Sequence, residues 1–99
     1  MIELMLGQHN ELIKELSDGD GQPLAGATVT ATIAGTQLSV QMTETATAGR
    51  YEGQLLVQGL LPGRRTLRWH GTTGDDRPFE FREQLRVSWP QPERLVEED

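Results

Sequence analysis

DGQPLAGATVTATIAG, residues 20–35, is the stretch that decides the fold. In its second half every other residue is small or aliphatic, and these positions are Ala27, Val29, Ala31 and Ile33. Threonines fill most of the places between them. Because β-branched threonine suits a solvated pleat and disfavours a helix, this alternation predicts a half-buried β-strand. Pro23 and Gly26 predict the turn through which the chain enters that strand.

The same period of two recurs further along the chain. Residues 37–43 follow a short link, which predicts a tight hairpin with the first strand. Residues 50–57, 64–70 and 79–89 continue the alternation, and the inward positions predicted in these runs are Leu38, Val40, Met42, Tyr51, Gly53, Leu55, Val57, Leu67, Trp69, Phe79, Phe81, Leu85, Val87 and Trp89. Glu83 falls on the apolar parity of the last run, which predicts a β-bulge or a register change near residues 82–84.

The start of the chain has two interpretations. An apolar stripe at Leu12, Ile13 and Leu16 fits one face of a helix. The alternation of residues 2–6, followed by a turn and a run at 11–16 that pairs back, fits two strands. We favour the strands, because they agree with the pattern of the rest of the chain.

Regularly spaced strands with Gly, Pro and Asp in the turns, and no βαβ pattern, predict an all-β fold. We expect a single antiparallel β-sandwich of immunoglobulin-like type, with about seven strands, over residues 1–89. The last ten residues, 90–99, hold four carboxylates and one arginine, so they carry −3 of the net charge of −6. This composition predicts a flexible acidic tail.

Composition excludes several classes of protein. The chain has no cysteine, so disulfide and thiol chemistry are excluded. A net charge of −6 argues against nucleic acid as the main partner, because phosphate contacts need a basic face. The N-terminal residues lack the basic region of a signal peptide, and no apolar run is long enough to span a membrane. We therefore expect a chain made in the cytoplasm, with no membrane partner.

The most suggestive metal motif is a pair of alternating carboxylates, Asp18 and Asp20, which resembles the start of a calcium loop. The later positions of such a loop do not fit. Gln22 is followed by Pro23 where glycine is required, and Val29 stands where the bidentate glutamate belongs. We expect a strand-joining turn and no metal or other cofactor.

Catalytic side chains are equally hard to assemble. His9 and His70 come from different segments and have no metal-ligand spacing. The serines Ser17, Ser39 and Ser88 lie in turns or strands without a nucleophile elbow. The sequence therefore predicts a protein that is not an enzyme.

Arginine is the residue type with the most suggestive arrangement. Four arginines, two in each of the last two predicted strands, occupy positions whose side chains face outward. They would form stripes that meet an acidic surface or the acidic tail of an adjacent copy, with two apolar tail residues as anchors. The predicted interface residues are Arg64, Arg68, Arg82, Arg86, Leu95 and Val96.

Three stretches together resemble a known group of modules: residues 21–33, with the pattern G-x-P-L-x-G-A-x-V-x-A-x-I, residues 49–51, and residues 62–69, with P-G-R-x-x-L-x-W. They are similar to the immunoglobulin-like or transthyretin-like sandwiches of bacterial surface proteins and tailed phages. The opening Met1–Leu4, with Gly7, Asn10 and Leu12, and the Tyr51-Glu52-Gly53 strand resemble small single-domain proteins encoded among phage and prophage structural genes.

The resemblance covers about residues 1–88 and implies a structural or head, neck or tail accessory protein of a virion, assembled with other virion proteins and copies of itself. It carries over no catalytic or binding residue. The alternative function is an immunoglobulin-like module that recognises a host surface or a carbohydrate. That function needs an exposed aromatic platform, whereas Trp69 and Trp89 both have inward parity. A periplasmic metal-handling domain would need export and Met/His clusters, which the sequence does not supply.

Overall fold

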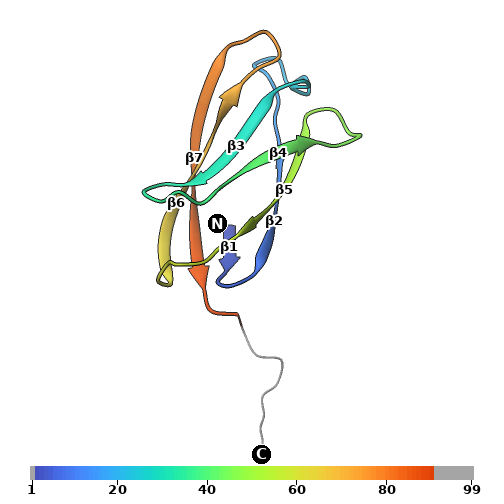
Figure 1. Ribbon diagram of the computed structural model, residues 1–99. Helices are drawn as coiled ribbons and strands as arrows, with labels where there is room; N and C mark the ends of the chain where they lie inside the picture. The colour runs from blue at the N-terminus through green and yellow to red at the C-terminus, as the bar shows by residue number, and fades with distance from the viewer. Residues whose placement is uncertain (1, 91–99) are drawn as a thin grey trace, which may run out of the picture.

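The computed structural model describes residues 2–90, which form seven β-strands and no helix. The strands are β1 (Ile2–Met5), β2 (His9–Glu15), β3 (Thr28–Ile33), β4 (Ser39–Glu44), β5 (Arg50–Leu56), β6 (Gly63–Thr72) and β7 (Pro78–Ser88), as Figure 1 shows. The prediction of an all-β chain with about seven strands is confirmed. Within the described range, no helix is long and apolar enough to cross a membrane.

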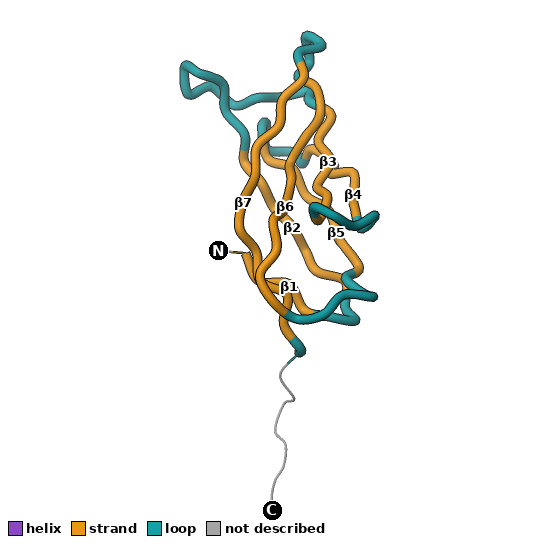
Figure 2. Tube along the Cα trace, turned by 90° about the vertical axis from the view of Figure 1, so that its left-hand side faces the viewer, coloured by secondary structure: helices purple, strands orange, loops and turns teal. Residues whose placement is uncertain are grey.

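All seven strands belong to one sheet, in the order β1-β7-β6-β3-β4-β5-β2. The sheet curls until it is nearly closed and barrel-like, and most of the loops lie at its two ends, whereas the β3–β4 loop lies on its side (Figure 2). One end holds the β1–β2 turn, the β5–β6 connection and the C-terminal end of β7 (Figure 1). The opposite end holds the β2–β3, β4–β5 and β6–β7 connections.

The pairing of the first two strands differs from the prediction. β1 runs parallel to β7, from Ile2 opposite Leu85 to Met5 opposite Ser88, so the sheet is not wholly antiparallel. β2 pairs with β5 rather than back onto β1, and the helical interpretation of this segment is wrong. The turn between the two strands explains the exchange. Leu6 N donates to Ser88 O at 2.9 Å and Gly7 N donates to Val57 O at 2.7 Å, so the chain crosses from the edge of β7 to the edge of β5.

The inward parity predicted for the strands is confirmed at nearly every position. The core side chains are Leu4, Leu6, Leu12, Val29, Ala31, Ile33, Met42, Tyr51, Leu55, Val57, Leu67, Trp69, Leu85 and Val87. Trp89 is the exception, because it is 66% exposed. β7 ends at Ser88, so the side chain of Trp89 lies beyond the last pair of the sheet and has no layer to cover it.

The predicted bulge near residues 82–84 is also wrong. β6 and β7 keep one register from Gly63 opposite Val87 to Thr72 opposite Pro78. Glu83 therefore points to the inner side as its parity requires, and it finds polar partners there, as described below. A carboxylate at an apolar position needed no register change, because hydrogen bonds satisfy it where it is.

The turn that begins the opening motif is fastened by a buried tyrosine. The Tyr51 hydroxyl donates to Leu24 O at 2.6 Å and accepts from Ala27 N at 3.0 Å. The carboxylate of Glu44 accepts from Gly26 N and from Gly49 N, each at 2.9 Å. The entry turn of β3 is thereby tied to the β4–β5 connection at one end of the barrel.

Candidate functional site

The four arginines of the predicted stripes lie on one outer face. β6 and β7 place Arg64 directly opposite Arg86, and Arg68 directly opposite Arg82. The structure places them on two neighbouring strands, as the sequence pattern predicted, and their role in an interface stays a prediction. Like charges directly opposite one another destabilise a sheet, so the carboxylates near each pair matter.

The two arginine pairs differ in how their charge is balanced. Glu80 Oε2 lies 3.9 Å from Arg68 Nε and 3.3 Å from Arg82 Nη2. Arg64 and Arg86 have no ion pair among residues 2–90, and both are exposed. Glu3 of β1 lies opposite Arg86 in the sheet, and its carboxylate accepts from Ser88 Oγ at 2.9 Å. The two arginines without an ion pair therefore lie at the end of the sheet where β6 begins and β7 finishes.

Apolar side chains surround that same end. Leu61 is 76% exposed and Trp89 is 66% exposed, and Pro62 beside them is exposed as well. Residues 86–89 line a shallow depression of about 390 Å³ together with Pro62 and Gly63. We call the exposed side chains at this place the end patch, and they are Leu61, Pro62, Arg64, Arg86 and Trp89.

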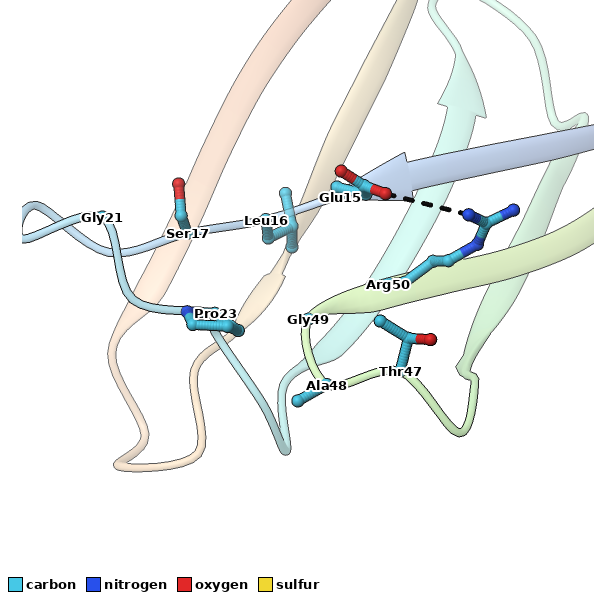
Figure 3. Close-up of a pocket in the computed structure, with 9 residues that line it drawn as sticks. All are labelled: Glu15, Leu16, Ser17, Gly21, Pro23, Thr47, Ala48, Gly49 and Arg50. Atoms are coloured by element: carbon cyan, nitrogen blue, oxygen red, sulfur yellow. Dashed lines mark ion pairs between the residues drawn. The ribbon is translucent and has the colours of Figure 1, made fainter.

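A second depression, of about 410 Å³, lies at the opposite end of the barrel between the β2–β3 and β4–β5 connections (Figure 3). Its charged groups are Glu15 and Arg50, whose Oε2 and Nη1 atoms are 3.8 Å apart. The other lining residues contribute backbone, apolar groups and the hydroxyls of Ser17 and Thr47.

A polar network lies between β7 and β2, on the side where the sheet does not close, and we call this side the barrel opening. Glu83 Oε1 on β7 accepts from Lys14 Nζ on β2 at 2.9 Å and from Trp69 Nε1 on β6 at 2.8 Å. The Lys14 ammonium also lies 5.6 Å from the ring centre of Trp69 and 5.3 Å from that of Phe81. Burial raises the pKa of the Glu83 carboxyl, but hydrogen bonds from Lys14 and Trp69 outweigh it, so the net shift is downward.

Two of the candidates for metal binding or catalysis, Asp18 and His70, have local structural roles. Asp18 Oδ1 accepts from the backbone N–H groups of Asp20 and Gln22, at 2.8 and 3.0 Å, as in an Asx turn. His70 Nε2 lies 3.1 Å from Thr32 Oγ1 on the neighbouring strand. In the part of the chain that the structure describes, no three His, Cys, Asp or Glu side chains gather into a metal site.

Sequence reasoning missed part of this surface. Leu95 and Val96 lie outside the described residues, whereas Leu61 and Trp89 are exposed apolar residues that parity did not find. One signal was present in the sequence: Trp89 directly precedes Pro90, and a strand pattern usually ends before a proline.

Comparisons of this chain with protein families, with curated proteins and with solved structures find no match.

Proposed function

We propose that the protein is a non-enzymatic structural component of a tailed-phage or prophage particle, acting in the head, neck or tail through protein–protein contacts. Its place is the virion, and its partners are other virion proteins and copies of itself. We also propose that the barrel-like sheet is an immunoglobulin-like sandwich. Support for this subtype comes from the strand count and from the likeness of the 21–33 turn and strand to such modules.

The observation that carries the functional proposal is the arginine face. It pairs Arg64 with Arg86 and Arg68 with Arg82 across two strands, although the chain as a whole has a net charge of −6. An acidic protein that places four arginines on one outer face of its sheet has the electrostatic pattern of a contact surface for acidic protein. Copies of the chain supply such acidic surface themselves, which suits a repeated assembly.

The test is co-expression with the proteins encoded by neighbouring genes, followed by sedimentation of particle-sized material. We expect the chain to sediment with assembled virion proteins. The double variant Arg68→Glu with Arg82→Glu should be lost from that fraction, whereas Arg77→Glu should remain. Arg77 is a matched control, because it is an exposed arginine in the β6–β7 turn and lies outside the face of the four arginines. Neighbouring genes without virion proteins, or a chain that never sediments with them, would refute the proposal.

Exposure of Trp89 supports the second candidate, a module that binds a carbohydrate or a host surface. Its residue is 66% exposed, whereas Trp69 is buried, so one aromatic ring is open to stack on a sugar. A titration with glycans, followed by tryptophan emission, tests this function. A saturable change that disappears in Trp89→Phe supports the binding module, and an unchanged emission across the glycan set refutes it.

A further inference from the structure

We propose that the end patch binds the acidic C-terminal segment of a second copy, residues 93–99, so that copies associate head to tail. The inference rests on the proposed function, because it names the partner of one end of the arginine face. It concerns the five exposed side chains Leu61, Pro62, Arg64, Arg86 and Trp89.

The chemistry of the patch defines what it can bind. Leu61, Pro62 and Trp89 offer exposed apolar surface next to a shallow depression. Arg64 and Arg86 lie opposite each other on the adjoining strands, and neither has an ion pair within residues 2–90. An aromatic ring beside arginines is the composition found at the centres of protein interfaces. The fitting ligand is a short apolar segment flanked by carboxylates.

The chain carries one such segment at its own end. Residues 93–99 read ERLVEED, in which Leu95 and Val96 are flanked by Glu93 on one side and by three carboxylates, residues 97–99, on the other. Leu95 and Val96 are apolar, as are the exposed side chains Leu61, Pro62 and Trp89 of the patch. The carboxylates match the two arginines that lack a partner among the described residues.

Geometry favours a second copy over the same copy. Pro90 directly follows Trp89, and Pro92 stands two residues later. With only residues 90–92 between Trp89 of the patch and Glu93, a segment bound to its own patch would have to reverse at once, whereas the patch of a second copy sets no such limit. A segment that binds the patch of the next copy gives a heterologous contact, which closes into a ring or extends as a filament.

Charge exchange between two full-length variants tests the proposal. The patch variant carries Arg64→Glu and Arg86→Glu, and the tail variant carries Glu97→Lys and Glu98→Lys. Sedimentation velocity over a concentration series should show that each variant alone self-associates roughly tenfold or more weakly than the unmodified chain. An equimolar mixture should regain association, because each variant then meets a complementary charge. Arg77→Glu should associate like the unmodified chain, and circular dichroism confirms that each variant is folded.

Three results would overturn the inference: an unmodified chain that stays monomeric at high concentration, a patch variant that associates normally, or a mixture that regains nothing. A contact within one copy would show as compaction independent of concentration, and it would equally overturn the proposal. None of these results decides the proposed function, because sedimentation with virion proteins is measured separately. The two proposals therefore fail by different observations.

Discussion

Glu83 Oε1 accepts a hydrogen bond from the indole Nε1 of Trp69 at 2.8 Å, so the carboxylate at the one anomalous position of β7 serves the largest core residue. Lys14 Nζ reaches the same oxygen at 2.9 Å from the far side of the barrel opening. An inward-pointing carboxylate on a strand is therefore a partner for a buried donor, and it also links β7 to β2. This network makes the anomaly in the sequence understandable.

Removal of the acceptor should destabilise the fold. Glu83→Ala leaves the Trp69 N–H without its partner, which we expect to cost about 1–3 kcal/mol in the free energy of unfolding. Glu83→Gln keeps an acceptor oxygen for the indole and loses only the charge, so its loss should be smaller. Urea unfolding followed by near-UV circular dichroism measures both variants. Equal losses for alanine and glutamine would show that the hydrogen bond to Trp69 is unimportant.

The same carboxylate predicts a dependence of stability on pH. In the folded chain the pKa of Glu83 lies below its ordinary value of 4.5, because the Lys14 and Trp69 hydrogen bonds outweigh the effect of burial. The stabilisation is therefore complete above the pKa of the unfolded chain and is lost as the pH falls through the lowered folded value. The stability difference between the unmodified chain and Glu83→Gln should shrink as the pH falls below 4.5 and through the lowered pKa of the folded chain. A difference that stays constant over this range would contradict the prediction.

Glu44 should contribute in the same direction. Its pKa is lowered first by the hydrogen bond from Gly49 N and then by that from Gly26 N. Its stabilisation is therefore also lost as the pH falls through the lowered folded value. Glu44→Ala should release the entry turn of β3 from the β4–β5 connection, because it removes both acceptor oxygens. Hydrogen exchange at the amides of Gly26 and Gly49 should become faster in this variant at neutral pH, while the amides of the β6–β7 pairs should keep their protection. Unchanged exchange at both glycines would exclude the bridging role.

The alternation of inward and outward side chains was the part of the prediction that the structure confirmed. The strict alternation of residues 27–34 predicted β3 and its buried face, because burial on one side of a pleated strand requires a period of two. Parity also placed the four arginines outward, but it carries no information on strand partners. The parallel β1–β7 pair and the β2–β5 pair depend on where a three-residue turn crosses the barrel, which is a tertiary property.

The same limit explains the two wrong predictions in the run of residues 79–89, which are the inward position of Trp89 and the bulge near Glu83. Alternation treats every residue of a run alike. Trp89, however, lies past the end of the sheet, and Glu83 is bonded to Lys14, which is 69 residues earlier in the chain. Neither fact is local in sequence. The end patch could be predicted only in part for this reason: its arginines follow parity, and its exposed apolar residues follow from the place where the strands stop.

Close approach of backbones makes Gly71 irreplaceable. A Cβ at this position of β6 would collide with the carbonyl oxygen of Thr28 on β3, and a backbone atom in a central pair of strands has little freedom to move. Gly71→Ala should therefore cost about 3 kcal/mol in the free energy of unfolding. Gly19→Ala is the matched control, because a Cβ there meets nothing within 4 Å. Thermal unfolding compares the two variants, and a Gly71→Ala protein as stable as the control would refute the close approach.

The charges at the barrel opening should also keep its edges apart from other chains. β1 covers only the Leu85–Ser88 part of β7, so within residues 2–90 no strand pairs with the outer edge of residues 78–84 or with that of β2. Inward-pointing charges are one means by which proteins discourage edge-to-edge pairing.

The double variant Lys14→Met with Glu83→Gln removes both charges and retains an acceptor for Trp69. We expect it to remain folded and to aggregate, and high salt should increase this aggregation because salt strengthens apolar burial. Light scattering over a salt series distinguishes it from the charged contact of the end patch, which salt weakens. Lys14→Arg with Glu83 retained is the control and should scatter like the unmodified chain, whereas a double variant that stays dispersed at every salt concentration would show that the edges are protected by other means.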